Sequence, residues 1–154
     1  MKKYILLILA IPFLFSSCSD EEPSPEARIT GIYEQNYEFA ETDWQTTIQF
    51  EREGTFYTER VVKNSGGDEI IGFYYYGSGT YTISEDDVAV LNFEEYFIGP
   101  EDGGPVAKSE LYEYEDGRGV MNYSILENYT RLRYQCGPSE FCAPSQDDDF
   151  IRVD

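Results

Sequence analysis

Apolar and polar side chains alternate with a period of two through most of this chain. Between residues 44 and 51, Trp44, Thr46, Ile48 and Phe50 fall on one side, and the intervening Gln, Thr and Glu residues fall on the other. Successive side chains of a β-strand point to opposite faces of a sheet, so this pattern is typical of half-buried strands. The sequence therefore predicts a β-protein rather than a helical one.

Turn signals divide the alternating pattern into short segments. Clusters of Gly, Asn and Asp mark the turns, and the strands are expected between them. The predicted strands are residues 44–51, 55–63, 70–76, 80–84, 88–97, 106–115, 119–126, 129–136 and 149–153. The Gly-Ser-Gly segment at 77–79 indicates a bulge or kink, and Asp-Gly at 116–117 indicates a tight hairpin. Residues 28–33 are expected to form a short helical turn before the first strand.

Eight to ten strands at such short intervals favour an antiparallel meander. Closing a meander into a barrel removes its exposed edges, so the predicted fold is an all-β, up-and-down β-barrel of about eight strands. A barrel of about eight strands leaves room for packed side chains or for one small ligand. The fold class therefore leaves open whether the interior is solid or hollow.

The charge of the chain limits its partners. Thirty Asp and Glu residues stand against eleven Lys and Arg residues, and the formal net charge is −19 at pH 7. Such a surface repels nucleic acid and anionic headgroups, so we expect no nucleic-acid partner. Fourteen Tyr, ten Phe and one Trp supply enough apolar area to offset chain entropy, so the acidic chain is expected to fold.

The first seventeen residues carry the features of a secretory signal peptide. Residues 1–3 are Met-Lys-Lys, residues 4–15 form an apolar run, and two serines precede Cys18. The apolar run from 5 to 15 holds eleven residues, whereas a membrane-spanning helix needs ~20. We therefore expect the segment to be removed rather than to remain as a transmembrane anchor.

Cys18 stands at the cut site, where it resembles the lipidated cysteine of bacterial lipoproteins, whose relaxed signals are familiar in the Bacteroidota. In that class the thiol is diacylated, the cysteine becomes the new N-terminus, and several acyl chains, such as palmitate, give stable anchoring. The Ser-Asp-Glu-Glu segment at 19–22 is similar to the acidic signal that sends lipoproteins of that phylum to the outer face of the outer membrane. The alternatives are an ordinary cleaved signal with a chance cysteine, and an acidic linker that is merely solvated.

The lipoprotein resemblance implies a division of the chain and an address. Residues 1–17 would be the signal peptide, 18–27 an acidic lipidated tether, and 28–154 the folded domain. The protein would be lipid-anchored at the outer membrane, at the cell surface or on the periplasmic face. Its oligomeric state is left open.

The remaining cysteines, Cys136 and Cys142, form an even pair. Outside the cytoplasm such a pair is most simply a disulfide, and the five intervening residues can form a tight loop. A metal site is the sharper alternative, but the chain has no His and no third thiol nearby. We therefore predict a disulfide and no metal at this position.

Three segments resemble the lipocalin-like domains of small bacterial lipoproteins. They are Ile-Thr-Gly-Ile-Tyr at 29–33, the strand and turn formed by Thr-Ile-Gln-Phe at 47–50 and Glu-Gly-Thr-Phe at 53–56, and Gly-Thr-Tyr-Thr-Ile-Ser at 79–84. The resemblance covers about residues 29–153. It implies a lipocalin-like barrel and suggests that the mouth of the barrel binds a small apolar molecule.

No catalytic constellation is visible in the sequence. The absence of His removes the Ser-His and Cys-His nucleophile pairs and the commonest zinc ligand, so we expect no enzyme, no metal and no cofactor. The acidic clusters at 85–87, 101–102 and 147–149 are rich in the oxygen ligands that Ca²⁺ prefers. None has a spaced calcium motif, so they are expected to be solvated turn residues.

The Phe-Tyr-Tyr-Tyr run at 73–76 is the strongest aromatic feature. Alternate members of a strand point to opposite faces, so two rings are expected inside the barrel and two outside. The ligand-binding candidates are Trp44, Tyr57 and Tyr75, which would form an aromatic platform for a sugar or a peptide. The main hypothesis for the domain is a small, apolar ligand held in the barrel mouth. The alternative is an interaction or glycan-binding surface protein whose barrel is solid.

Overall fold

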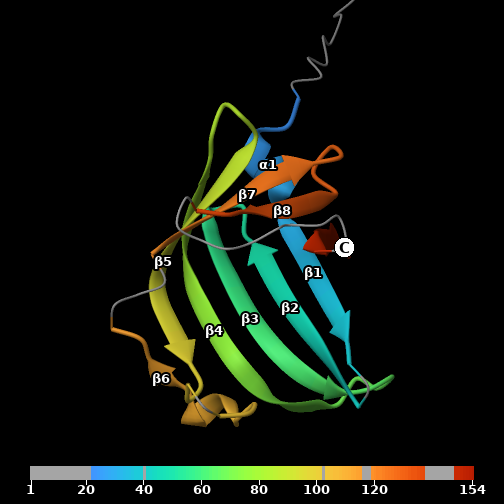
Figure 1. The fold of residues 1–154 in the computed structure, drawn as a ribbon. Helices are drawn as coiled ribbons and strands as arrows, with labels where there is room; N and C mark the ends of the chain where they lie inside the picture. The colour runs from blue at the N-terminus through green and yellow to red at the C-terminus, as the bar shows by residue number, and fades with distance from the viewer. Residues whose placement is uncertain (1–21, 40, 102, 116–118, 138–147) are drawn as a thin grey trace, which may run out of the picture.

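Nine antiparallel strands form one sheet in the described part of the chain, and eight of them close into a barrel (Figure 1). The computed structural model describes residues 22–39, 41–101, 103–115, 119–137 and 148–154. The elements are α1 (Pro25–Ile29), β1 (Gly31–Glu38), β2 (Thr42–Phe50), β3 (Thr55–Asn64), β4 (Ile70–Ile83), β5 (Val88–Ile98), η1 (Lys108–Glu110), β6 (Tyr112–Glu113), β7 (Val120–Leu126), β8 (Arg131–Gln135) and β9 (Phe150–Arg152). The ring runs β1-β2-β3-β4-β5-β7-β8-β9 and returns to β1, while β6 adds to the far end of β5. The predicted up-and-down barrel of about eight strands, like that of lipocalin-like domains, is confirmed.

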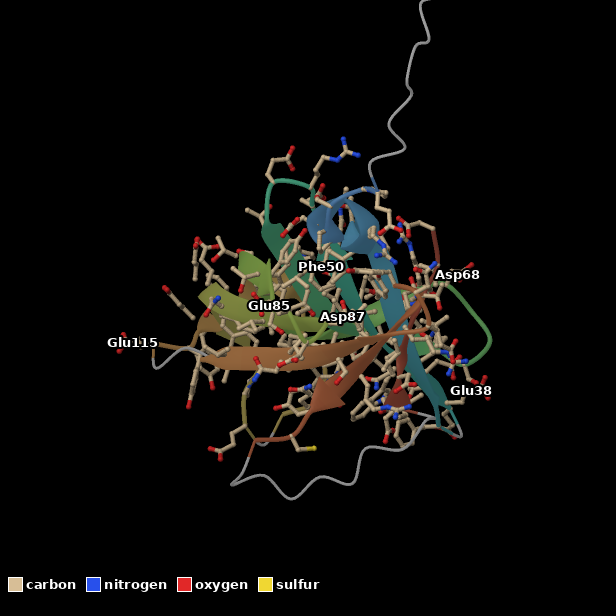
Figure 2. All side chains as sticks on the ribbon, turned by 90° about the horizontal axis from the view of Figure 1, so that it is seen from above. Glu38, Phe50, Asp68, Glu85, Asp87 and Glu115 are labelled. Atoms are coloured by element: carbon tan, nitrogen blue, oxygen red, sulfur yellow. The ribbon has the colours of Figure 1, made fainter. Side chains whose placement is uncertain are left out.

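The alternating pattern also decides which side chains face the barrel interior. In β2, Thr46, Ile48 and Phe50 are buried, whereas the residues between them are only half-buried. β2 pairs with β3 along its whole length, and this register places Phe50 opposite Phe56. Figure 2 looks along the barrel from above and shows Phe50 inside the ring, with Glu115 and Glu38 at the periphery.

A short helix precedes the first strand, as expected, but it lies at residues 25–29 and not at 28–33, and residues 31–33 belong to β1. The helix α1 begins at Pro25, because Ser24 accepts a hydrogen bond from the backbone N–H of Ala27 and proline is favoured in the first turn, and it ends at Ile29. The following segment, β1, pairs with β2 over all eight of its residues. Its inward side chains include Gln35 and Tyr37, so the apolar alternation that signals a strand is weak there.

Residues 77–79 form a bulge, as predicted, but they do not separate two strands. β4 is continuous over fourteen residues, and its register against β5 shifts between Ser78 and Gly79. A Cβ atom at Gly79 would overlap the carbonyl oxygen of Asn92, so only glycine allows β5 to approach at this point. The bulge lets one long strand curve with the barrel wall.

The strand predicted for residues 106–115 is largely absent, and that prediction was wrong. Val106 forms a single bridge with Phe73, η1 follows, and only the two residues of β6 pair with β5. The Glu110 carboxylate accepts a hydrogen bond from the backbone N–H of Ala107 at 3.0 Å, which favours the helical turn of η1. The hairpin predicted at 116–117 lies outside the described residues.

The main hydrophobic core fills the end of the barrel that α1 covers (Figure 1). Aromatic rings meet there edge to face, with Phe50 5.7 Å from Tyr33 and 4.9 Å from Tyr81. The core residues are Ile29, Tyr33, Ile48, Phe50, Phe56, Tyr81, Ala89, Leu91, Tyr123, Ile125, Tyr129, Leu132 and Phe150. The interior at the α1 end is therefore solid.

Candidate functional site

The inward face of the barrel changes character along its strands, away from α1. On β3 the buried Phe56 is followed by buried Thr58 and then by half-buried Arg60. The registers of β3, β4 and β5 place Arg60 beside Tyr75, and Tyr75 beside Ile98. A row of aromatic and polar groups thus crosses the end of the barrel opposite α1, which we call the open end. The α1 end, by contrast, has an apolar core.

Arg60, Tyr75 and Tyr96 form the centre of this row. The Arg60 Nε donates a hydrogen bond to the Thr46 hydroxyl at 2.8 Å, and its guanidinium carbon lies 5.3 Å from the centre of the Tyr75 ring. Tyr75 lies 5.6 Å from Tyr96, between ring centres. Within the described residues Arg60 forms no ion pair, so its charge is held by a hydroxyl and an aromatic face.

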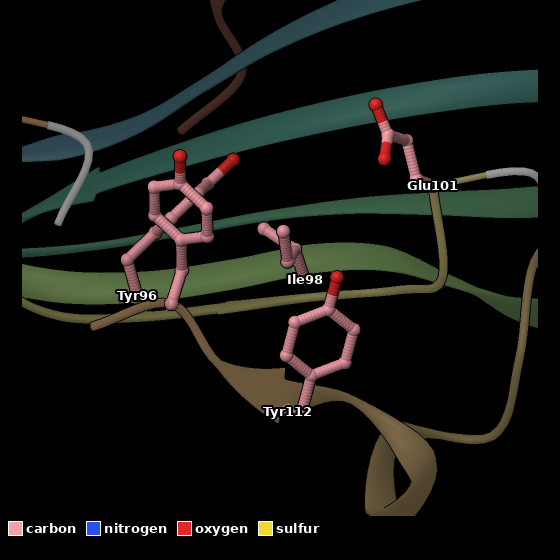
Figure 3. Close-up of a pocket in the computed structure, with 5 residues that line it drawn as sticks. Tyr96, Ile98, Glu101 and Tyr112 are labelled. Carbon is pink, nitrogen blue, oxygen red and sulfur yellow. The ribbon is translucent and has the colours of Figure 1, made fainter. Parts of the chain in front are cut away.

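A pocket of about 400 Å³ opens beside this row, on the β5–β6 side (Figure 3). The described residues that line it are Tyr96, Ile98, Glu101, Tyr112 and Tyr114. Tyr96 is buried, whereas Tyr112 and Tyr114 remain 47 % and 41 % exposed. In Figure 3 the side chains of Tyr96, Ile98 and Tyr112 point to the same side of the strands, and Glu101 stands at the far end of the row from Tyr96.

The tyrosines of the pocket are held by β5 and β6. Tyr96 lies opposite Gly77 of β4, where the absence of a side chain leaves room for the ring of Phe93, and Phe93 meets Tyr96 edge to face at 5.5 Å between ring centres. Tyr114 meets Tyr96 at 6.5 Å with the rings at 89°, and its backbone N–H donates to the Tyr96 carbonyl oxygen at 2.8 Å. Tyr112 is fixed by the pairing of β6 with Ile98. The pocket is therefore built on sheet backbone, although its inner surface is aromatic.

A second aromatic group lies at the β1–β2 hairpin end of the barrel. Trp44 contacts Tyr74 at 4.8 Å and Phe39 at 5.0 Å, measured between ring centres. Phe39 is 52 % exposed, so this group is accessible from outside. Trp44 shares the inward side of β2 with Thr46, the partner of Arg60.

The structure brings two of the three predicted ligand-binding residues to the open end and places the third elsewhere. Trp44 and Tyr75 face the interior, whereas Tyr57 lies on the outer surface of β3. The Tyr57 hydroxyl donates to Glu59 at 2.6 Å and accepts from the Lys108 ammonium at 2.7 Å. Burial first, and then the Glu59 hydrogen bond, raises the pKa of Tyr57 to about 12.

The aromatic run at 73–76 divides two inside and two outside, as predicted, but its members do not alternate. Tyr74 and Tyr75 contact interior partners, whereas Phe73 and Tyr76 lie 5.2 and 4.9 Å from the Lys108 ammonium outside. The register of β3 against β4 skips Tyr74, so a bulge turns two consecutive rings inward. The pocket residues of β5 and β6 were not predicted, because no sequence signal places them beside Tyr75.

The acidic cluster at 147–149 is not simply solvated, which corrects that expectation. Asp149 is buried and pairs with Arg133 at 2.7 and 2.9 Å. Asp148 accepts a hydrogen bond from the Tyr37 hydroxyl at 2.9 Å, and its carbonyl oxygen accepts one from Gln35. Burial, followed by the Asp148 hydrogen bond, raises the pKa of Tyr37 to about 12. Both aspartates thus fasten the start of β9 to the barrel, whereas 85–87 are exposed as expected.

Other predicted residues lie wholly or partly outside the described part of the chain. Cys18 and Cys142 belong to segments that are not described, and Cys136 is half-buried just after β8. The disulfide and the lipidation therefore stay predictions. Among the described residues, no cluster of three or more acidic, Cys or His side chains could hold a metal ion, and no helix is long and apolar enough to cross a membrane.

Comparison with known proteins gives no assignment. No family model matches the chain, and no curated protein sequence matches it. The geometry of the open end is therefore the basis for a functional proposal.

Proposed function

We propose that this protein is a lipid-anchored outer-membrane or cell-surface lipoprotein whose barrel binds a small, largely apolar molecule without catalysis. The observation that carries the proposal is the pocket of about 400 Å³ at the open end, lined by Tyr96, Ile98, Tyr112 and Tyr114. Small-molecule sites are typically concave, mostly apolar and ~300–1,000 Å³ in volume, with a few polar groups that set orientation. The tyrosine hydroxyls and Glu101 would be those polar groups.

The packing of the other end limits the size of the ligand. The core around Phe50, Tyr33 and Tyr81 leaves the α1 half of the interior filled. A ligand would therefore occupy only the open end, in contact with one wall of the barrel, and would stay partly exposed. This favours a compact molecule over a long acyl chain that needs a deep, enclosed cavity.

The position of α1 gives the proposed anchor a direction. The tether that begins at Cys18 joins the barrel at α1, which covers the filled end, while β6, whose Tyr112 lines the pocket, lies at the opposite end (Figure 1). A protein anchored through Cys18 would thus carry its pocket on the side remote from its attachment. The ligand would come from the surrounding solution rather than from the anchoring bilayer.

The second candidate, glycan or protein binding on a solid outer face, has a weaker basis. Tyr57, Tyr76 and Phe97 form a row across β3, β4 and β5, with Tyr76 and Phe97 stacked at 4.6 Å and 12°. These half-buried rings could stack on a sugar. However, the Lys108 ammonium lies over Tyr57 and Tyr76, so the protein itself covers part of the row.

A pocket-filling substitution tests the first candidate. The full chain, held in phosphatidylglycerol nanodiscs, is titrated calorimetrically with indole, and the heat measured with empty nanodiscs is subtracted. Ile98→Trp places a ring inside the pocket and is expected to weaken indole binding at least about tenfold. Val90→Trp is the matched control, because Val90 is on β5 but outside the pocket lining, and it should leave binding unchanged. Equal binding to the wild type and to Ile98→Trp would exclude the pocket as the site.

A further inference from the structure

We propose that the ligand of the pocket is an organic cation, of the alkylammonium or quaternary ammonium class. This inference rests on the function proposed above and specifies its ligand. The pocket combines three tyrosine rings with one carboxylate, that of Glu101, and none of the described residues that line it is basic. Aromatic rings attract a cation through the negative face of their π-systems, and quaternary ammonium groups are recognised by cages of such rings.

The exposure of the rings leaves a place for the cation. Tyr112 and Tyr114 are 47 % and 41 % exposed although they line a concave surface. Tyr114 stands at 89° to the deeper Tyr96, which forms a corner of two rings. Figure 3 shows Tyr112 next to Ile98, its cross-strand partner, and Tyr96 on another side of Ile98, so both rings adjoin an apolar side chain. Glu101 is exposed and supplies the opposite charge at the end of the row.

Other tyrosines of this chain already make cation–π contacts with basic side chains. Basic side chains lie over tyrosine rings at 4.2 Å for Arg28, 4.9 Å for Lys108, 5.3 Å for Arg60 and 5.9 Å for Arg152. Within the described residues, no basic side chain lies over Tyr112 or Tyr114. These two rings therefore offer to a ligand the contact that other tyrosines of this protein make internally.

The overall charge acts in the same direction. A net charge of −19 attracts cations and raises their concentration near the surface, whereas it repels anions. An anionic ligand would have to overcome this field and would meet the Glu101 carboxylate in the pocket. A neutral ligand would be indifferent to both. The charge of the ligand is thus the property that an experiment can isolate.

The test compares benzyltrimethylammonium with its neutral carbon isostere, neopentylbenzene, which has nearly the same shape. Both are titrated into the full chain in phosphatidylglycerol nanodiscs, which present neither detergent nor choline headgroups. We expect the cation to bind at least about tenfold more tightly than the isostere. Glu101→Gln and Tyr112→Leu are each expected to weaken cation binding about fivefold and to leave binding of the isostere nearly unchanged.

Glu113→Gln is the matched control for the carboxylate. Glu113 is exposed, follows Tyr112 in β6 and does not line the pocket, so its loss removes the same charge without changing the site. It should change cation binding by less than about twofold. If the isostere binds as tightly as the cation, or if Glu101→Gln and Glu113→Gln have equal effects, the cation inference is wrong and the pocket remains a binding site. If neither probe binds the wild type, the cation inference is overturned too, and a negative indole titration would show that the proposed function fails with it.

Discussion

Replacing Tyr33 with Phe tests how the filled end of the barrel is held together. Tyr33 is fully buried, and its hydroxyl donates a hydrogen bond to the carbonyl oxygen of Tyr129 at 2.8 Å. Tyr129 is the last of three consecutive residues with positive φ, after Glu127 and Asn128. A left-handed segment is costly for residues other than Gly, so an external contact that fixes it is valuable. Through this hydrogen bond, Tyr33 connects β1 to the β7–β8 turn.

The magnitude follows from the hydrogen bond and from burial. A hydrogen bond of this type contributes about 1 kcal/mol net, and a buried carbonyl oxygen left without a partner adds a further cost, so Tyr33→Phe should lower the free energy of unfolding by about 1–2 kcal/mol at pH 7. Burial raises the pKa of Tyr33 to about 12, although the Arg152 charge opposes the shift. The folded state therefore holds the phenolic proton more tightly than the unfolded state, whose pKa is about 10.

The higher pKa of Tyr33 in the folded state determines how the free energy of unfolding changes with pH. The stabilisation is fully present below about pH 10 and is lost as the pH rises through the interval from about 10 to about 12. By about pH 11 the wild type should have lost about 1 kcal/mol of its free energy of unfolding through ionisation of Tyr33, and Tyr33→Phe has no such group to ionise. The difference in the free energy of unfolding between the two proteins should therefore become smaller. Urea unfolding monitored by the fluorescence of the single Trp, Trp44, measures both values. Equal stability at pH 7, or a gap that does not change with pH, would refute this assignment.

Other substitutions probe the wall, the turn and the anchor. Gly79→Ala should destabilise the barrel by at least about 3 kcal/mol in urea unfolding, because the new methyl group overlaps the Asn92 carbonyl oxygen, and a smaller loss would mean that β5 can move away. Glu127→Gly should raise the free energy of unfolding by about 0.5 kcal/mol, since relief of a positive φ outweighs the exposed ion pair with Arg131, and a decrease would contradict this balance. Cys18→Ala should abolish metabolic labelling with palmitate, whereas continued labelling would exclude this cysteine as the lipidation site.

The sequence was sufficient for the fold class because each strand carries its own local signal. Regular alternation marked β2 and β3 nearly to their ends. It failed for β1, whose inward Gln35 and Tyr37 are polar or amphipathic, and for 106–115, where the backbone turns into η1 after a single bridge. For β1 the pairing with β2 decides the structure, whereas the alternating segment 106–115 pairs with β5 only at Tyr112 and Glu113.

The binding site depends still more on pairings between strands. Trp44 and Tyr75 could be selected as aromatic residues of strands, and both face the open end. Tyr57 could not be rejected, because its outward direction follows from its register against β2 and β4. The bulge at Tyr74 then reverses which face each following side chain of the aromatic run points to, and an alternating pattern alone does not predict such a bulge.

The same strands therefore serve two purposes along their length, and the change occurs within a few residues. On β3 the inward series runs from Phe56 through Thr58 to Arg60, from an apolar core to a charged group held by an aromatic ring. The apolar half supplies the burial that stabilises the barrel, and it lies next to α1 and the tether. The open half contributes less of this apolar burial, so its tyrosines can stay partly exposed at little cost to the free energy of folding. For this reason pocket variants such as Tyr112→Leu should change binding without unfolding the protein, whereas Tyr33→Phe should do the reverse.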